Sequence, residues 1–182
     1  MKKIGITLLF LLLGLTLPLN AEIYLYVDSD GVIRPDQKRK ASPNENITEQ
    51  KHSYPDRYDP YIKAASGKYD VAFALIKAII KTESDFNPRA ISPKGALGLM
   101  QIMPENIKHL KIQNPFDPAE NIIGGTRHFK YLFNHFAGDL SLALAAYNAG
   151  IKPVERCQCI PPFKETRNYV KKVSRYYKEL KK

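Results

Sequence analysis

From about Tyr61 to the C-terminus, apolar residues recur at the three-to-four-residue spacing that is typical of amphipathic helices. The run "YDVAFALIKAIIKTES" predicts a helix over about 69–84. A loop rich in Pro and Gly follows, and we then expect a short helix near 97–102, stopped by Pro104, and a further helical turn in "PENIKHL".

Three later helices carry boundary signals. In "NPFDPAENIIGGTRHFKYLFNHF", Asp117 is a suitable N-cap and Pro118 suits the first helical position. "GDLSLALAAYNAG" predicts a helix capped by Asp139 and ended by Gly150. The last segment, "TRNYVKKVSRYYKELKK", predicts a helix that docks one apolar stripe, formed by Tyr169, Val173, Tyr176 and Leu180. Residues 61–182 therefore predict a compact, mainly α domain with a groove lined by loops.

The N-terminal part of the chain has a different pattern. Lys2 and Lys3 precede an apolar run over 4–19, which at 16 residues is shorter than the roughly 20 needed to span a bilayer. A membrane anchor is the alternative, but this pattern favours a secretory signal peptide over 1–21 and an extracytoplasmic, for example periplasmic, location. In the segment 22–60, "EIYLYV", "DSDG" and "VIR" predict a small β-hairpin, and the Pro- and Asn-rich remainder predicts a linker.

The charge of the chain narrows the class of partner. The 182 residues carry a formal net charge of +10, which falls to +8 without Lys2 and Lys3. Such a charge suits an acidic polymer: nucleic acid, anionic lipid or a cell wall that bears peptide carboxylates. Export makes nucleic acid the least suitable of the three, so we expect no nucleic-acid partner.

Two other classes of chemistry lack their motifs. The sequence has no GxSxG and no HExxH, and His128 and His135, seven residues apart, are expected on the surface of a helix. Cys157 and Cys159 provide too few ligands for a metal, and we expect them to be a free or weakly paired couple in a loop. We therefore expect no metal site and no cofactor.

Glu83 is the candidate for acid chemistry. It lies four residues after Ile79, on the apolar face of the 69–84 helix, whereas Lys77 and Lys81 mark an opposite face expected in solvent. Burial and the negative end of the helix dipole both raise the pKa of a carboxyl group in this position. A shift from about 4.3 to about 6 would correspond to roughly 2.3 kcal/mol and would leave Glu83 partly protonated near neutrality, as a general acid requires. The alternative is that Glu83 ends the helix and points into water.

Further polar residues interrupt apolar segments in the same way. Gln101 is a polar group within "LGLMQIMP", Met103 offers an adaptable apolar surface, and Tyr147 and Asn148 end the apolar run "LALAAYN". If these helix ends and loops meet, a carboxylic acid, an amide and a phenol surround one groove. Donors, acceptors and an aromatic face are the groups that bind a sugar ring.

Four segments, "ESDFNPRAISPKGALGLMQIMP", "NPFDPAENIIGGTRHFKYL", "LALAAYNAG" and "IPPFKETRNYVKKV", occur in this order. Over residues 61–182 this succession resembles the catalytic domain of the soluble lytic transglycosylases, relatives of goose-type lysozyme. The resemblance implies a mainly α, α+β lysozyme-like fold. The segment "IYLYVDSDGVI" is similar to a small strand-turn-strand module that precedes such domains. The sequence departs from the family at "VERCQCIPPF", where the family usually has a loop containing Gly.

The resemblance also implies an activity, cleavage of the β-1,4 bond between N-acetylmuramic acid and N-acetylglucosamine in peptidoglycan glycan strands. Glu83 matches the single catalytic acid of the family, and Glu165 matches a position at the edge of the groove. Positions that contact sugar, and one beside them, are matched by Ser92, Gln101, Met103, Tyr147 and Asn148.

A single acid fits the sequence, because the other nearby carboxylates have explanations of their own. Asp85 points about 200° away from Glu83 on a continued helix, and Asp117 and Asp139 are caps. With one carboxyl group, we expect a lytic transglycosylase that forms 1,6-anhydromuramic acid and acts as a monomer. Two alternatives stay open: a muramidase of the lysozyme type, and a peptidoglycan-binding accessory of a trans-envelope secretion or pilus system.

Overall fold

The computed structural model describes residues 25–27, 33–35 and 54–181 of the chain. It divides the chain into two compact units, residues 1–51 and 52–182. In the first unit, strand β1 (Leu25–Val27) pairs antiparallel with β2 (Ile33–Pro35), with Tyr26 opposite Arg34. These strands coincide with the expected hairpin. The expected signal peptide over 1–21 and residues 36–53 of the expected linker lie outside the described residues.

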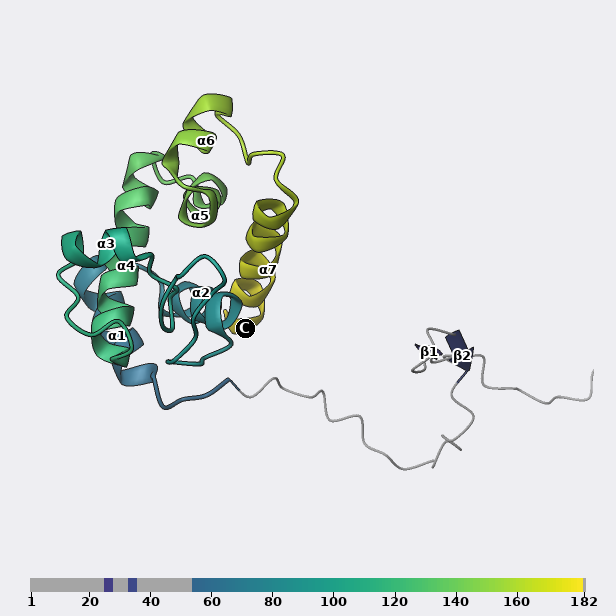
Figure 1. Ribbon diagram of the computed structural model, residues 1–182, viewed down its shortest axis with the longest axis horizontal. Helices are drawn as coiled ribbons and strands as arrows, with labels where there is room; N and C mark the ends of the chain where they lie inside the picture. Colours follow the sequence, from purple (N-terminus) through teal and green to yellow (C-terminus); the bar gives the residue numbers. More distant parts are fainter. Residues whose placement is uncertain (1–24, 28–32, 36–53, 182) are drawn as a thin grey trace, which may run out of the picture. The chain divides into compact units, whose positions relative to one another are not determined.

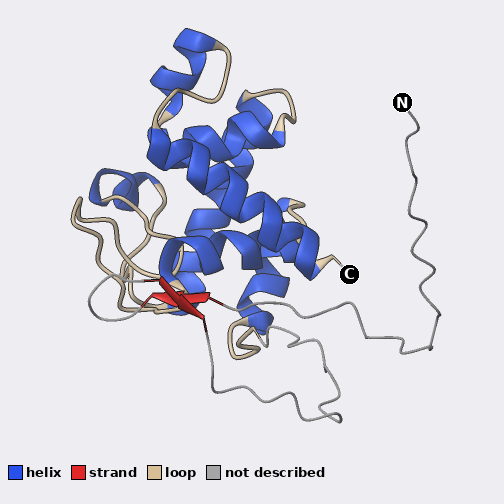
Figure 2. Cartoon of the chain, turned by 90° about the vertical axis from the view of Figure 1, so that its right-hand side faces the viewer, coloured by secondary structure: helices blue, strands red, loops and turns tan. Residues whose placement is uncertain are grey.

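The second unit is helical, and loops join its helices (Figure 2). Within residues 54–181 the helices are α1 (Asp59–Tyr69), α2 (Phe73–Ser84), α3 (Pro104–His109), α4 (Pro118–His135), α5 (Leu140–Ala149), α6 (Ile151–Cys157) and α7 (Lys164–Leu180).

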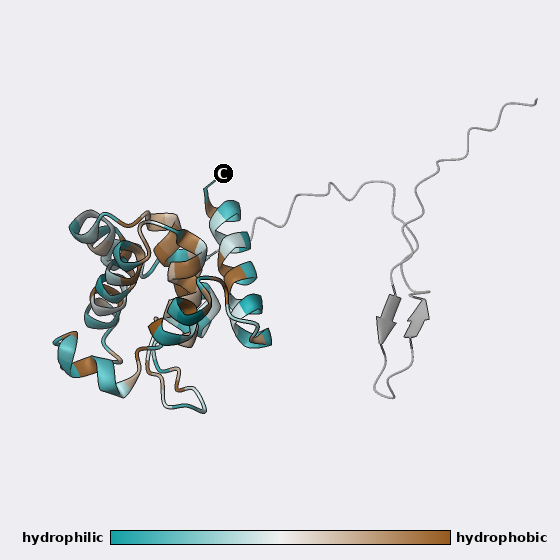
Figure 3. Ribbon diagram, turned by 90° about the horizontal axis from the view of Figure 1, so that it is seen from above, coloured by the Kyte–Doolittle hydropathy of each residue, from teal (hydrophilic) through white to brown (hydrophobic). Residues whose placement is uncertain are grey.

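Helix α2 forms the centre of this unit and contacts both α1 and α7 (Figure 1). Its residues 75–80 are all buried, as expected for a helix that is surrounded by protein. Helix α4 packs on α1 and α5, and α5 also contacts α6 and α7. Helix α7, which ends at the C-terminus, shows a mixture of hydrophilic and hydrophobic residues along its length in Figure 3, because only one stripe of it faces the core. No helix among the described residues has the length and apolar character to cross a membrane.

The caps read from the sequence are confirmed. The Asp117 carboxylate accepts a hydrogen bond from the Glu120 amide, and the Asp139 carboxylate accepts one from the Leu142 amide. Each cap pairs an amide at a helix start that has no partner within the helix. Gly150 ends α5 with φ +84°, as expected.

The helix expected over 69–84 begins later than predicted. Asp70 adopts a left-handed conformation (φ +50°) and ends α1, and α2 starts only at Phe73. The Lys130 ammonium on α4 donates a hydrogen bond to the Asp70 carbonyl oxygen at 3.1 Å. This contact with a helix distant in sequence stabilises the break between α1 and α2.

The prediction of a short helix near 97–102 is wrong. Leu97 instead forms isolated β-bridges with Ile91 and Ile102, and Gly98 and Gln101 have φ of +76° and +48°. A methyl group added to Gly98 would collide with the Asn121 side chain and with the carbonyl oxygen of residue 115. Tertiary contact therefore overrides the apolar pattern of this segment, and it forms a tight loop.

Asn121 on α4 fixes this loop from inside the core. It is completely buried. Its Oδ1 accepts from the Met100 amide at 2.7 Å, and its Nδ2 donates to the carbonyl oxygens of Leu97 (3.0 Å) and Pro115 (2.7 Å). One amide side chain thus pairs with three backbone groups, and of these only the Leu97 carbonyl has another partner in the loop, the Ile102 amide.

Three further features were not read from the sequence. Lys77, expected in solvent, is only 4% exposed, and its ammonium donates to the Asp59 carboxylate at 2.6 Å. A buried ammonium needs such a partner, and the sequence pattern of α2 did not reveal one. Helix α6 was not expected, because the cysteine pair at its end was assigned to a loop. Cys157 and Cys159, expected to be free or weakly paired, are joined by a disulfide at the end of α6.

Candidate active site

The last turn of α2 carries Glu83 and is held on both sides. The Ser84 hydroxyl donates to the carbonyl oxygens of Ile80 (3.2 Å) and Leu99 (2.8 Å), which joins the helix end to the loop that follows it. Asp85 ends the helix in a left-handed conformation (φ +50°). The backbone on either side of Glu83 is therefore fixed before any ligand binds.

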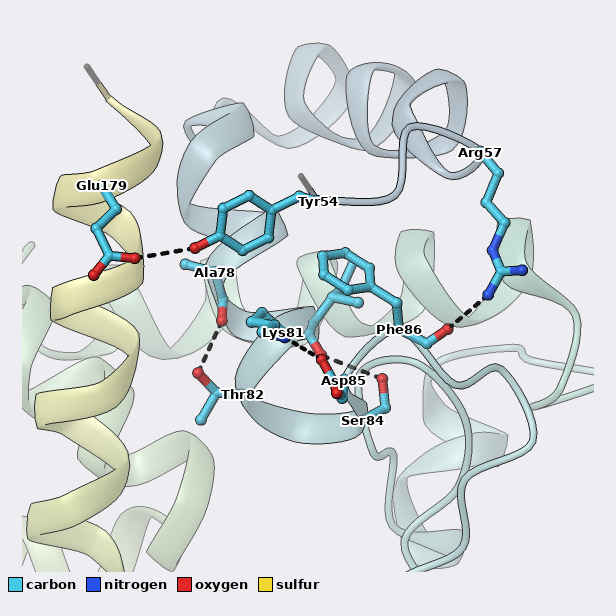
Figure 4. A network of polar contacts seen from close by, with 10 residues as sticks. Tyr54, Arg57, Ala78, Lys81, Thr82, Ser84, Asp85, Phe86 and Glu179 are labelled. Atoms are coloured by element: carbon cyan, nitrogen blue, oxygen red, sulfur yellow. Dashed lines mark hydrogen bonds and ion pairs between the residues drawn. The ribbon is translucent and has the colours of Figure 1, made fainter. Parts of the chain in front are cut away.

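Polar contacts also fix the residues around the end of α2 (Figure 4). The Asp85 carboxylate pairs with Lys81 one turn earlier. The Arg57 guanidinium donates to the Phe86 carbonyl at 3.3 Å, and the Tyr54 hydroxyl donates to a Glu179 carboxylate oxygen on α7 at 3.1 Å. Asp85 thus points to Lys81 and away from the acid chemistry expected of Glu83.

Glu83 is half-buried and lines a cavity of about 380 Å³. Residues from α2, from the loop before α3, from α5 and from α7 form its walls. All the residues that the sequence singled out lie around this cavity, namely Glu83, Ser92, Gln101, Met103, Tyr147, Asn148 and Glu165. Segments separated by more than 80 residues in the sequence are therefore brought to one place.

The Glu83 carboxyl holds its proton unusually tightly. Burial raises its pKa from 4.5 to about 8, and the nearby Glu165 carboxylate also raises it. The Tyr169 hydroxyl acts in the opposite direction, because a phenol near the carboxylate stabilises the anion. The direction agrees with the expectation from the sequence, and the pKa lies higher than the value of about 6 used there. At neutral pH most Glu83 side chains are protonated.

Tyr169 is a site residue that the sequence pattern missed. It was assigned only to the apolar stripe of α7, and it is indeed buried at 6% exposure. Its hydroxyl group is buried without a hydrogen-bond partner among the described residues, and burial beside Glu83 raises the pKa of the phenol well above its usual value. In an apolar stripe nothing distinguishes such a phenol from an ordinary core residue.

The polar groups around the cavity are themselves oriented by the protein. The Tyr147 hydroxyl donates to the Met100 carbonyl at 2.8 Å, and the Asn148 Oδ1 accepts from the Thr166 hydroxyl at 2.8 Å. Burial raises the pKa of Tyr147 well above its usual value, so this phenol stays neutral.

The amide and hydroxyl of the loop before α3 are also engaged. Gln101 Nε2 donates to the carbonyl oxygens of Ala90 (3.1 Å) and Gly98 (2.9 Å), and the Ser92 Oγ accepts from the Ala96 amide at 3.0 Å. These contacts fix the cavity wall and leave fewer free donors than the sequence suggested.

Glu165 is a second carboxylate beside Glu83, whereas the sequence analysis identified a single candidate acid. It lines the same cavity as Glu83 and raises the pKa of Glu83. Its own carboxylate accepts a 3.0 Å ion pair from Lys94, and both side chains are mostly exposed, at 73% for Lys94 and 67% for Glu165. A second carboxylate therefore lies in the cavity wall, where the sequence identified none as a partner, and it forms an exposed ion pair with Lys94.

A larger chamber of about 780 Å³ adjoins the cavity. Five residues line both spaces, which are therefore continuous: Lys94, Met103, Tyr147, Asn148 and Glu165. His128, expected on a helix surface, lines this chamber half-buried, with its ring 5.5 Å from that of Tyr147. Burial lowers the pKa of His128, so it is neutral at pH 7.

The described residues contain no group of three or more His, Cys, Asp or Glu side chains that could hold a metal ion. The groups that line the cavity include one protonated carboxyl, a neighbouring ion pair, one phenol and two amides. These groups suit proton transfer to a neutral, hydroxyl-rich ligand.

The sequence model of the family described as "Transglycosylase SLT domain" matches residues 60–170. The chain belongs to this family. A transglycosylase of Enterobacteria phage PRD1 is 42% identical over 89 residues, which are 49% of this chain and 33% of the phage protein. The soluble lytic murein transglycosylase of Escherichia coli K12 is 34% identical over 147 residues, covering 68% of this chain and 23% of that protein.

The fold of the family is confirmed by a solved structure. An inactive glutamate-to-glutamine mutant of the lytic transglycosylase Slt from Pseudomonas aeruginosa matches with a TM-score of 0.64 and 29% identity, over 68% of this chain and 24% of that one. The mainly α, lysozyme-like architecture expected from the sequence is therefore present. The chain spans between a fifth and a third of the length of these relatives.

Proposed function

We propose that this protein is a peptidoglycan lytic transglycosylase, which cleaves the β-1,4 bond between N-acetylmuramic acid and N-acetylglucosamine and leaves a 1,6-anhydromuramic acid end. The observation that carries the proposal is Glu83, a half-buried carboxyl in a groove with a pKa of about 8. An acid that keeps its proton at neutral pH can give it to the oxygen of a leaving sugar.

The relatives support the substrate. Their names describe soluble and membrane-bound lytic murein transglycosylases, and one solved relative is an inactive mutant in which a glutamate is replaced by glutamine. Peptidoglycan lies outside the cytoplasm, so the proposal includes an extracytoplasmic location, which agrees with the signal peptide expected over 1–21. The excess of basic residues suits a wall that bears carboxylates.

The proposed reaction uses Glu83 twice. Protonated Glu83 donates to the glycosidic oxygen as the bond to the muramic acid C1 breaks, and the acetamido oxygen of that sugar attacks C1 and stabilises it. The Glu83 carboxylate then takes the proton of the C6 hydroxyl, and O6 bonds to C1 while the acetamido oxygen leaves. Glu83 ends protonated, as it began, and no water is consumed. Attack within one molecule gains from a high effective concentration of the nucleophile.

Within this mechanism Glu165 does not react with the sugar. It acts through its charge on the pKa of Glu83. Its negative charge favours the protonated form of Glu83, and its own carboxylate forms an ion pair with Lys94. The remaining site residues position the sugar: Ser92, Gln101, Met103, Tyr147 and Asn148 line the same cavity.

Glu165 also favours a second candidate function, a muramidase of the lysozyme type. Glycosidases that use water need two carboxylates on the two sides of the bond, and Glu165 is a second carboxylate in the cavity. In that case Glu165 would activate a water or bind C1, and its replacement by Gln would abolish turnover.

Mass spectrometry of the products tests the choice. Purified peptidoglycan is digested with the protein, and we expect muropeptides that are one water lighter than hydrolysis products. Glu83→Gln should abolish cleavage and still sediment with the wall, whereas Glu165→Gln should remain active. Products that carry a full water would establish the muramidase, and turnover by Glu83→Gln would refute the assignment of the acid. Sedimentation without cleavage by the unmodified protein would instead indicate a peptidoglycan-binding accessory, for example of a secretion or pilus system.

A further inference from the structure

The solvent-facing side of α7 carries a row of positive charge that the proposed reaction does not use. Helix α7 packs on α2 and α5, and its buried residues are Thr166, Tyr169, Val170 and Val173. The row on the other side of the helix, which we call the basic stripe, consists of Lys164, Arg167, Lys171, Arg175 and Lys178. All the side chains of the basic stripe are exposed to solvent.

Helical geometry aligns the residues of the basic stripe. They follow one another at intervals of three or four positions along the chain, so at about 100° per residue they fall within an arc of about 80°. The centre of this arc points roughly 150° away from the centre of the buried residues. With a rise of about 1.5 Å per residue, the basic stripe is about 21 Å long. It is therefore a straight row of cations on the outer side of the helix.

The carboxylates of α7 lie outside the arc of the basic stripe and have other partners. Glu165 pairs with Lys94 at 3.0 Å. Glu179 accepts a hydrogen bond from the Tyr54 hydroxyl at 3.1 Å, and the basic stripe makes one ion pair within residues 54–181, between Arg175 and Glu179 at 3.8 Å. Like charges three and four residues apart repel and weaken a helix, whereas helices that only face solvent commonly alternate the sign of their charges. A partner of opposite charge would offset this repulsion.

We propose that the basic stripe docks α7 on a membrane surface rich in anionic phospholipid, with the helix lying flat against the headgroups. None of its residues lines the Glu83 cavity or the adjoining chamber, so the basic stripe does not continue the groove proposed for the glycan. Headgroups in a fluid bilayer can rearrange under a straight row of fixed charges, and such binding requires charge density and no pocket. The apolar side of α7 lies in the core, so the contact is electrostatic and α7 does not insert.

This inference goes beyond the proposed function and takes from it only the extracytoplasmic location, which favours lipid over nucleic acid. Peptide carboxylates of the wall are also anionic, and the test separates them from lipid. Vesicle binding requires no turnover, so the result is independent of the chemistry at Glu83.

Sedimentation with lipid vesicles tests the docking surface in the full-length protein. Binding is measured on phosphatidylcholine vesicles and on vesicles in which roughly one third of this lipid is replaced by phosphatidylglycerol. Any contribution of the apolar run 4–19 is then present with both. Each basic side chain near an anionic surface strengthens binding about fivefold. The triple variant Lys164→Gln, Lys171→Gln, Lys178→Gln should therefore lower the partition coefficient on anionic vesicles about a hundredfold and leave that on neutral vesicles unchanged.

The matched control removes the same charge from exposed lysines outside α7. The triple variant Lys63→Gln, Lys108→Gln, Lys111→Gln should change binding to anionic vesicles by less than about threefold. Replacement of the same three lysines of the basic stripe by Arg should retain binding, because the charge is kept. Equal losses in the two Gln triples would mean that net charge alone decides, and no preference of the unmodified protein for anionic vesicles would mean that no such surface exists; each result overturns the proposal.

Sedimentation with purified peptidoglycan decides between lipid and wall. We expect the Gln triple in the basic stripe to sediment with the wall as the unmodified protein does. If this variant loses wall binding and the unmodified protein shows no preference for anionic vesicles, the basic stripe binds the carboxylates of the wall and the proposal is wrong.

Discussion

The burial of Glu83 predicts that this carboxyl lowers the stability of the folded protein at neutral pH. Its pKa is about 8 in the folded protein and 4.5 as its ordinary value, so between these values the folded state keeps a proton that the unfolded state releases. A state that binds more protons loses stability as pH rises. The destabilisation is therefore absent below about pH 4.5, grows through pH 5 to 7 and is complete above pH 8.

The size of the effect follows from the two pKa values. One pKa unit corresponds to about 1.4 kcal/mol, and integration between pH 5 and pH 7 gives a loss of roughly 2 to 3 kcal/mol from this group alone. Glu83→Gln cannot ionise and is close to Glu in shape. We therefore expect the free energy of unfolding of the variant, relative to the unmodified protein, to increase by about 2 kcal/mol from pH 5 to pH 7.

Urea unfolding followed by circular dichroism at pH 5, 6 and 7 measures this difference, provided that one transition is seen by two probes. The difference between the two proteins at each pH removes the contribution of every other titrating group. Glu105→Gln serves as the control, because this carboxylate is exposed and is not among the groups that shift the pKa of Glu83. If the difference between Glu83→Gln and the unmodified protein changes by less than about 0.5 kcal/mol over this range, Glu83 is ionised at neutrality and the acid mechanism fails.

Three further predictions concern the surroundings of the acid. Tyr169→Phe removes a group that lowers the pKa of Glu83, so the alkaline limb of the pH–rate profile should move to higher pH; an unchanged limb would show that the phenol does not face the acid. Glu165→Gln removes a charge that raises the same pKa, so the limb should move to lower pH, and a shift in the other direction would contradict the electrostatic role. Asn121→Ala leaves the Met100 amide and the Pro115 carbonyl without their partner and should lower the free energy of unfolding by at least about 2 kcal/mol, whereas the exposed Asn134→Ala on the same helix should change it by less than about 0.5 kcal/mol; similar values for both would refute the role of Asn121.

Features that depend on neighbouring residues could be predicted from the sequence. The caps Asp117 and Asp139 act on amides three residues ahead, so the sequence alone is enough to place them. The direction in which Glu83 points follows from its helical spacing to Ile79. The residues around the Glu83 cavity were brought together by resemblance to a family, and their common cavity is visible only in the fold.

The predictions from the sequence fail where a contact between residues distant in sequence determines the local structure. The segment 97–102 has the apolar pattern of a helix, but Asn121 pairs its backbone groups and Gly98 has no room for a side chain. The sequence pattern predicted that Lys77 lies in solvent. In the fold its ammonium pairs with the Asp59 carboxylate, 18 residues earlier in the chain.

The sequence by itself thus determined the helical class of residues 61–182, the starts of α4 and α5 and the place of Glu83 on the apolar face of α2, because these depend on local backbone chemistry and helical periodicity. Only the tertiary structure decided that Tyr169 and Glu165 act on the pKa of Glu83, that His128 faces a chamber, and that a second, charged chamber adjoins the first. Electrostatic effects depend on distance through space and on the exclusion of water, and neither quantity can be read from the order of residues along the chain.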